Sequence, residues 1–340
     1  MTTIDIPAPV SGGLLLTYRC SCCCRHCMYA CSPDWDADWI GENELERGLS
    51  VLADRLIPAP AGPDSIGLNH GLHFTGGEPF LNYDLLCSAV EMADEKDIPS
   101  LFAETNAFWC TDAEKAEERL RHLKALGLKG IMISVNPFYT EYVPFERTKR
   151  CIDVSTDVFG RTTAVYQQAY YAQFERMGLE GTLSLEDYLE RAGQDALIRG
   201  VELFLMGRAA RKLREFYPHY AAHTFFGGHC RPTVLRPWHN HFDNYGNYLP
   251  GYCGGISLGN WLELDDIIED GIDPDDRPVL AAVLREDIKA LVEHARERGY
   301  EERDEGYISR CEVCIDARKY LAATGDYEEL RPREFYRQLD

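Results

Sequence analysis

The sequence lacks an excess of basic residues. It contains 35 Lys and Arg against 56 Asp and Glu, which gives a formal net charge of −21. Binding to a nucleic-acid backbone depends on a basic surface that releases counterions, so this charge argues against nucleic acid as a partner. Many of the acidic residues lie between Glu263 and Glu305, and we interpret this run as a solvated face.

Long apolar runs and export signals are also missing. No apolar stretch is long enough to cross a bilayer, and the first residues lack the charged and apolar regions of a signal peptide. We therefore expect a cytoplasmic protein with no membrane partner. In a reducing compartment, its 13 cysteines indicate metal or redox ligands and a few buried thiols, not a disulfide framework.

Hydrophobic periodicity predicts alternating strands and helices over the first two thirds of the chain. Strands are expected at residues 14–18, 66–74, 100–103, 130–135, 163–166 and 201–205. Helices are expected at residues 42–54, 83–95, 112–126, 185–198 and 208–216. This order is typical of right-handed parallel βα units, and about six of them predict an α/β fold with a partial (β/α)6 TIM barrel.

The composition changes after Pro218. Residues 219–259 are rich in Gly, His, Asn, Tyr and Pro, and a helix at 278–298 and a short helical tail follow. We therefore predict two domains, a barrel over residues 1–215 and a small C-terminal domain over residues 216–340.

Three cysteines near the N-terminus have a spacing that suits iron–sulfur chemistry. Cys20, Cys24 and Cys27 form a C-x3-C-x2-C pattern directly after the first predicted strand. Three thiolates can hold three irons of a [4Fe–4S] cluster and leave the fourth iron open to a substrate or cofactor. This spacing predicts a cluster that carries out chemistry on what binds to it.

A second motif follows the second predicted strand and completes a resemblance. Gly76, Gly77, Glu78 and Pro79, together with the three cysteines, resemble the radical S-adenosylmethionine (SAM) superfamily. The resemblance implies that the cysteines bind a [4Fe–4S] cluster and that the amine and carboxylate of SAM chelate its open iron. His26 stands where the family usually has an aromatic residue beside the adenine.

The cysteine loop contains further thiols that complicate the register. Cys23 and Cys27 repeat part of the spacing, and Cys22 and Cys31 lie close by. Only the set described above gives the complete pattern and also places His26 before its last cysteine. We interpret the extra cysteines as loop thiols without a ligand role.

The resemblance also implies further SAM contacts after later strands. These are Glu104 and Asn106 after the third strand, Ser134 and Asn136 after the fourth, and Arg208 after the sixth. Each of the first four is also a plausible strand-end cap or turn residue. Arg208 has two interpretations. In the first it lies near SAM or a second cluster, and in the second it forms an ion pair at the start of a helix.

The C-terminal part carries its own cysteine pattern. Cys230 and Cys253 flank Gly246, and Cys311 and Cys314 form a C-x2-C pair. This pattern resembles Twitch, the shortened form of the SPASM auxiliary-cluster domain, and implies one auxiliary [4Fe–4S] cluster. Four thiolates also suit structural zinc, and a site without metal is the remaining alternative.

As a radical SAM enzyme, the protein is expected to remove a hydrogen atom from its substrate, in oxidoreductase-like chemistry. The substrate is expected to be a small metabolite or a peptide, and the electron donor a flavodoxin or ferredoxin. Two alternatives stay open: an iron–sulfur electron carrier or scaffold without SAM chemistry, and a maturase of ribosomally synthesised peptides. The residue that delivers or accepts hydrogen is not identified from the sequence.

Overall fold

The computed structural model describes residues 3–199, 203–285 and 287–340. The chain forms two compact units. The first, which we call the sheet unit, contains Val10–Cys24 and Cys31–Leu203. The second, which we call the helical unit, contains Phe204–Asp340 with the short segments Arg25–Ala30 and Met1–Pro9. The N-terminal cysteine loop is thus shared, because Cys20 and Cys24 belong to the sheet unit and Cys27 to the helical unit.

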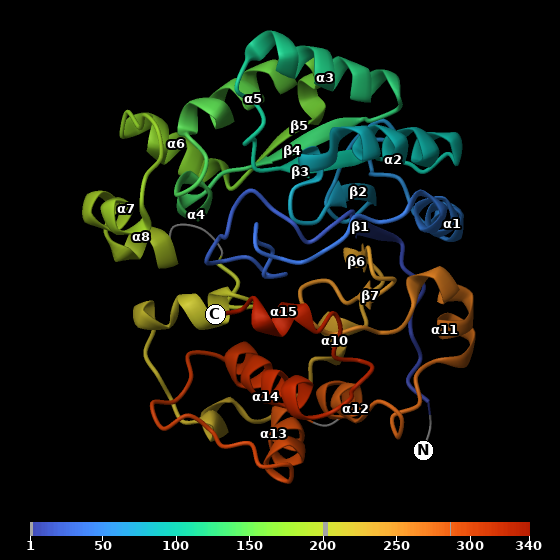
Figure 1. Cartoon of the computed structure of the whole chain (residues 1–340), viewed down its shortest axis with the longest axis vertical. Coiled ribbons are helices and arrows are strands. Elements are labelled where there is room, and N and C mark those ends of the chain that lie inside the picture. Colours follow the sequence, from blue (N-terminus) through green and yellow to red (C-terminus); the bar gives the residue numbers. More distant parts are fainter. Residues whose placement is uncertain (1–2, 200–202, 286) are drawn as a thin grey trace. The chain divides into compact units, whose positions relative to one another are not determined.

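The sheet unit is built on five parallel strands in the order β5-β4-β3-β2-β1 (Figure 1). They are β1 (Ser11–Leu15), β2 (Gly71–Thr75), β3 (Phe102–Thr105), β4 (Gly130–Ser134) and β5 (Thr163–Tyr166). β1, β2 and β4 are buried along their whole length, as parallel strands usually are. Their carboxyl ends meet at one edge of the sheet, because the register pairs Leu15 with Thr75 and Ser134 with Tyr166.

Helices connect these strands and lie along the sheet (Figure 1). The main connections are α1 (Glu42–Ala53), α2 (Tyr83–Glu95), α3 (Ala113–Ala125) and α5 (Phe145–Phe159). Shorter helices are η1 (Pro79–Asn82), α4 (Pro137–Thr140), η2 (Gly160–Thr162), α6 (Gln168–Arg176), α7 (Leu185–Ala192) and α8 (Gln194–Ile198). The unit is therefore a mixed α/β structure with a parallel sheet.

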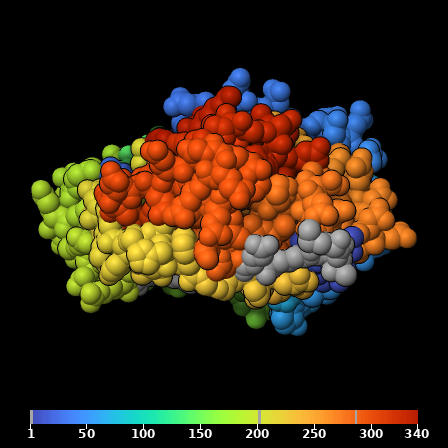
Figure 2. All heavy atoms as spheres, turned by 90° about the horizontal axis from the view of Figure 1, so that it is seen from below, coloured from blue at the N-terminus to red at the C-terminus, as the bar shows by residue number. Residues whose placement is uncertain are grey.

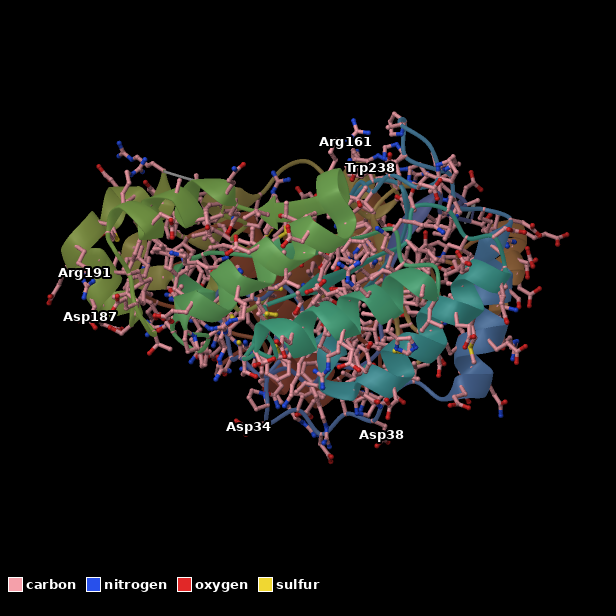
Figure 3. The ribbon with its side chains drawn as sticks, turned by 90° about the horizontal axis from the view of Figure 1, so that it is seen from above. Asp34, Asp38, Arg161, Asp187, Arg191 and Trp238 are labelled. Atoms are coloured by element: carbon pink, nitrogen blue, oxygen red, sulfur yellow. The ribbon has the colours of Figure 1, made fainter. Side chains whose placement is uncertain are left out.

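Local sequence explains where these helices begin and which face they bury. The Asn82 side chain accepts a hydrogen bond from the Leu85 backbone N–H and so caps α2. In α7, Leu185 and Tyr188 are buried three residues apart on one face of the helix. Asp187 and Arg191 of the same helix point outward into solvent, as Figure 3 shows.

The helical unit combines one antiparallel hairpin with short helices. The hairpin consists of β6 (Asn240–Asp243) and β7 (Tyr248–Leu249), and Gly246 in its turn has a φ of +84°. The helices before the hairpin are α9 (Ala209–Lys212), η3 (Arg214–Phe216), η4 (Ala222–Phe225) and α10 (Arg231–Val234). Those after it are η5 (Trp261–Glu263), α11 (Leu264–Asp270), α12 (Pro278–Arg285), α13 (Ile288–Arg296), α14 (Arg310–Thr324) and α15 (Glu334–Arg337).

A polar network anchors α14 within the helical unit. The Asp316 carboxylate pairs with Arg211 at 2.8 Å and with Arg303 at 2.7 Å, and it accepts a hydrogen bond from the Tyr300 hydroxyl at 2.8 Å. Its 12% side-chain exposure leaves these interactions only weakly screened by water. In Figure 2 the segment that holds α12, α13 and α14, orange to red, forms a closely packed face.

Several predicted elements agree with the structure, and others need correction. Strand β5 and helix α2 have the predicted bounds, whereas the helix expected at 185–198 is two helices, α7 and α8, because Gly193 has a φ of +79°. The helix expected at 278–298 is also two helices, α12 and α13. The sixth strand, expected at 201–205, begins outside the described residues, and 203–205 contain no strand.

The helices of the sheet unit that were not expected include α5 and α6. The buried face of α5 includes Thr148, Cys151 and Ser155 beside apolar residues, so hydropathy alone does not show its helical period.

Of the helices described, none has the length and apolar character that crossing a membrane requires.

Candidate functional site

The turn after β2 is held against the start of the cysteine loop by backbone hydrogen bonds. The Gly77 N–H donates to the Thr17 carbonyl at 2.8 Å, and the Glu78 N–H donates to the Arg19 carbonyl at 3.0 Å. A Cβ atom on Gly77 would lie 1.7 Å from the Arg19 oxygen and 2.8 Å from the Cys20 nitrogen. Only glycine fits here, and the Gly-Gly-Glu-Pro run therefore sets the path of the chain into Cys20.

The Glu78 carboxylate joins the ends of two neighbouring strands. It is 1% exposed and accepts hydrogen bonds from the Phe80 N–H, the Thr105 hydroxyl at 2.9 Å and the Asn106 N–H at 2.8 Å. Burial raises the pKa of Glu78 to about 7, although the three donors favour the charged form. Pro79 begins η1, whose first turn this carboxylate caps.

Asn106, directly after β3, connects this strand end to the cysteine loop. Its side-chain amide N–H group donates to the Ser21 hydroxyl at 3.0 Å and lies 3.4 Å from the Cys22 sulfur and 3.7 Å from the Cys20 sulfur. Its amide oxygen accepts from the Phe108 N–H. Both ends of this 4%-exposed side chain are therefore fixed, and they hold the loop from its start.

The fourth strand contributes through the short helix that follows it. The Cys24 thiol donates to the Phe138 carbonyl of α4 at 3.4 Å. Asn136 caps α4 by accepting from the Phe138 and Tyr139 N–H groups, and its amide donates to Gln167 at 2.9 Å. Asn136 thus acts as a cap after the strand, one of the two roles open from the sequence, and a SAM contact for it stays a prediction. Ser134 ends β4 and is 8% exposed.

A polar cluster lies on β2 and β3 just before these turns. The Glu104 carboxylate accepts from the Thr75 hydroxyl at 2.8 Å and lies 3.4 Å from the His73 Nε2 atom. Burial lowers the pKa of His73 to about 3, so the ring is neutral, and it stacks on Phe102. The Glu104 side chain is 23% exposed, which leaves part of the carboxylate accessible.

In the helical unit, Arg208 holds the segment that contains Cys27. Its N–H donates to the Cys27 carbonyl at 3.0 Å, and its guanidinium donates to the carbonyls of Ala30 at 2.6 Å and Gln338 at 3.0 Å. Burial and the nearby Arg208 cation hold the pKa of His26 well below its usual range, so its ring is neutral. Arg208 thus binds backbone carbonyls, and a cofactor contact for it stays a prediction.

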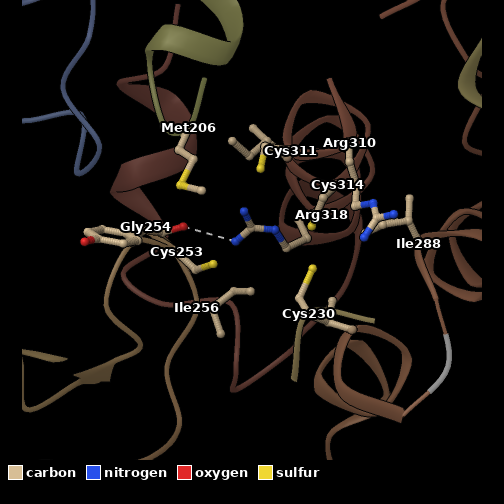
Figure 4. A pocket seen from close by; sticks show the side chains of 14 residues that line it. Met206, Cys230, Cys253, Gly254, Ile256, Ile288, Arg310, Cys311, Cys314 and Arg318 are labelled. Atoms are coloured by element: carbon tan, nitrogen blue, oxygen red, sulfur yellow. Dashed lines mark hydrogen bonds between the residues drawn. The ribbon is translucent and has the colours of Figure 1, made fainter. Parts of the chain in front are cut away.

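The four C-terminal cysteines line one cavity of the helical unit (Figure 4). Cys230 precedes α10, Cys253 follows the hairpin, and Cys311 and Cys314 lie on α14. The cavity offers about 40 Å³ to the centre of a water-sized sphere, several times the roughly 10–15 Å³ that one water requires. The rest of its lining is largely apolar, with Met206, Ile256, Val283 and Ile288 among the residues.

The donor chemistry of this cavity fits an iron–sulfur cluster. Burial raises the pKa of Cys253 and Cys311 to about 12, and the neighbouring thiols contribute to the rise. The thiols therefore keep their protons until a metal cation displaces them. No three His, Cys, Asp or Glu side chains within the described ranges converge closely enough for a single metal ion. Four thiols lining one cavity supply the type and number of ligands that a [4Fe–4S] cluster uses.

The sequence analysis missed several residues beside the N-terminal cysteine loop and in the C-terminal cavity. Thr105 and Thr75 follow the pattern of polar side chains at the ends of parallel strands, so their positions were a usable signal. His73 gave no such signal in the sequence, because a buried histidine in a strand resembles any other core residue. Arg318, in the C-terminal cavity, follows Cys314 by four residues on α14, and this helical spacing could have placed it.

The chain matches no family model and no curated protein. It is similar to the solved structure of BtrN in complex with AdoMet and 2-DOIA, with 14% identity, a TM-score of 0.43, and 78% of this chain and 83% of that one covered. Native anSMEcpe with bound AdoMet and Cp18Cys peptide matches with 10% identity and a TM-score of 0.42, over 92% and 97% of the two chains. Streptococcus suis SuiB bound to S-adenosylmethionine matches with 13% identity and a TM-score of 0.35, over 90% and 77%.

The steric role of Gly77 can be tested by adding one methyl group. We expect Gly77→Ala to lower the free energy of unfolding by about 1–3 kcal/mol or more, because the new Cβ displaces the Arg19–Cys20 backbone. Urea unfolding followed by circular dichroism measures this change.

Gly67→Ala is the matched control. The nearest atom to a Cβ at Gly67 is 3.4 Å away, so we expect a change within about 0.5 kcal/mol. Equal stability of the two variants would show that the turn after β2 does not need glycine at position 77.

Proposed function

We propose that this chain is a radical SAM enzyme whose reaction starts at a [4Fe–4S] cluster on Cys20, Cys24 and Cys27. The observation that carries the proposal is the joining of two motifs far apart in sequence. The Gly-Gly-Glu-Pro turn lies against the backbone of Arg19 and Cys20, and Asn106 reaches the same loop. An electron carrier with four cysteine ligands has no need of this turn, which favours SAM chemistry.

The residues of the sheet unit suit the tasks that SAM binding requires. Gly76 and Gly77 let the turn pack against the Thr17 and Arg19 backbone, and the buried Glu78 carboxylate keeps the turn in place. We assign the backbone of this Gly-Gly-Glu-Pro turn to the ammonium group of SAM. Glu104 presents a partly accessible carboxylate beside this turn. We assign Glu104, Asn106, Ser134 and Asn136 to the surroundings of SAM, with Asn106 and Asn136 holding the cysteine loop and α4 in position.

The next residues of the cysteine loop, His26 and Cys27, belong to the same motif in this proposal. Cys27 supplies the third thiolate, and the neutral ring of His26 offers a flat, uncharged face to the adenine. Arg208 fixes this segment through the carbonyls of Cys27 and Ala30. When bound, the reduced cluster and SAM supply a 5′-deoxyadenosyl radical that removes a hydrogen atom from the substrate.

We further propose that Cys230, Cys253, Cys311 and Cys314 hold an auxiliary [4Fe–4S] cluster in a Twitch-like domain. The shared cavity and its apolar lining support this assignment, as does the spread of the four thiols around a central space. Such a cluster would accept the second electron of a substrate oxidation or help to bind the substrate. We keep a partial barrel as the proposal for the first domain, and the five parallel strands described, one fewer than expected, support it.

The proposed substrate is a small metabolite or a peptide, and the proposed electron donor a flavodoxin or ferredoxin. The similar structure of BtrN is a complex with 2-DOIA, and that of anSMEcpe contains a bound Cp18Cys peptide. The proposal therefore keeps both kinds of substrate. The net negative charge of this chain supports a substrate other than nucleic acid.

The first prediction of this proposal concerns SAM cleavage. After anaerobic reconstitution with iron and sulfide, dithionite and SAM should give 5′-deoxyadenosine, and Cys24→Ala should abolish it because one iron loses its ligand. Cys23→Ala is the control and should keep full activity, since this neighbouring thiol is assigned no ligand role. A fully loaded cluster that forms no 5′-deoxyadenosine would leave the electron-carrier alternative in place.

The contact between Asn106 and the cysteine loop gives a second prediction. Asn106→Ala should slow 5′-deoxyadenosine formation by about 10–100-fold, the usual effect of losing a group that orients a metal ligand. Asn82→Ala removes only the cap of α2, so it should cost about 1 kcal/mol of stability and leave the rate unchanged. Equal rates of 5′-deoxyadenosine formation for both variants would show that Asn106 does not position the ligands of the first cluster.

Iron counting tests the auxiliary cluster. The reconstituted protein should bind about eight irons per chain, as two four-iron clusters require, and the double variant Cys311→Ala/Cys314→Ala should bind about four. Cys87→Ala, on the outside of α2, should bind the same iron as the unchanged protein. Zinc bound by the C-terminal cysteines, with iron unaffected by the double variant, would support the structural-zinc alternative instead.

A further inference from the structure

One buried arginine lies among the four C-terminal cysteines. Arg318 follows Cys314 by four residues and Cys311 by seven on α14, so the three side chains share one face of the helix. All three line the same cavity. Figure 4 shows the Arg318 side chain extending from α14 into this space, with the thiols of Cys230, Cys253 and Cys311 arranged around it.

The hydrogen bonds of Arg318 leave its charge without a counter-ion. The side chain is 3% exposed, and one terminal nitrogen donates to the Gly254 carbonyl at 3.1 Å and the Tyr336 hydroxyl at 3.2 Å. Its Nε atom is buried, and in the described part of the chain it finds no hydrogen-bond partner. Nor does any carboxylate among those residues form an ion pair with this guanidinium.

Such a charge is costly in the interior of a protein. Removing an ion from water costs several kcal/mol even after relaxation, and arginine does not escape the cost by losing its proton. The cation therefore persists, and a stable site requires an anion close to it.

We propose that Arg318 is the counter-ion of a polyanionic iron–sulfur cluster held by the four cysteines, and that it raises the reduction potential of that cluster. This inference rests on the auxiliary cluster of the proposed function. Four thiolates outweigh the positive charge of an oxidised four-iron core, so the bound group is an anion. Reduction adds one more negative charge, and a buried cation stabilises that charge more strongly than it stabilises the oxidised state.

Arg310 provides an internal comparison. It also lines the cavity, but it is partly exposed and donates to the Gly227 carbonyl. Arg310 interacts with the Cys230 thiol, but water screens its partly exposed charge more than the buried charge of Arg318, so Arg310 should affect the cluster less than Arg318 does. The proposal therefore predicts different effects for two arginines at the same cavity.

The experiment uses the full chain with Cys20, Cys24 and Cys27 replaced by Ala, so that only the auxiliary cluster forms. Redox titration followed by electron paramagnetic resonance gives its midpoint potential. Arg318→Gln should lower the ratio of reduced to oxidised cluster at least tenfold at a fixed potential, which corresponds to about 59 mV for a one-electron couple. Arg318→Lys should recover most of this loss, and Arg310→Gln should change the ratio less than threefold.

Each outcome separates this inference from the proposal on which it depends. If the background protein with an intact Arg318 binds no iron, the auxiliary cluster itself is wrong. If Arg318→Gln binds the cluster with an unchanged potential, the counter-ion role of Arg318 is wrong.

A thermal measurement decides the case in which Arg318→Gln does not load. Without metal, Arg318→Met should melt at the same temperature as the background protein or higher, because the variant no longer buries an uncompensated charge. A lower melting temperature of the metal-free variant would show that Arg318 only supports the fold, and it would overturn the proposal.

Discussion

The close approach of two backbone segments at Gly77 governs the arrangement of the candidate site. β1 and β2 pair in register as far as Leu15 and Thr75, and the same pairing continues beyond the strands into Thr17–Gly77 and Arg19–Glu78 hydrogen bonds. A side chain at position 77 would occupy the space of the Arg19 carbonyl. The register of the sheet thereby fixes the backbone position of the first cysteine.

Buried charges are accommodated in two different ways in this protein. The Glu78 carboxylate receives three hydrogen bonds from protein donors, and Arg208 donates to three carbonyls including that of Cys27 through its backbone, so protein groups satisfy both. Arg318 has a carbonyl and a hydroxyl as acceptors and a buried Nε atom without one among the described residues. A charge satisfied by the protein stabilises a local structure, whereas one left for a ligand makes the structure depend on that ligand.

Sequence patterns were sufficient where one local signal dominated. The regular apolar period predicted α2 and α3, and β5 was found from its short apolar run. The patterns failed where tertiary packing overrides composition, as in α5, whose buried face holds polar Thr148 and Ser155. The motif residues were identified, but the reason for Gly77 was not, because the approach of Arg19 exists only in three dimensions.

The position of Arg318 on the helix that carries two of the cysteines has a physical consequence. Cys311, Cys314 and Arg318 are joined by one hydrogen-bonded helix, which the Asp316 network holds in the unit. A displacement of α14 therefore moves two ligands and the cation together, and their mutual distances stay nearly constant. The Coulomb energy between a cluster and a cation depends on this distance and on the local dielectric. A counter-ion on the ligand-bearing helix thus gives a more constant electrostatic effect than a cation on a separate loop.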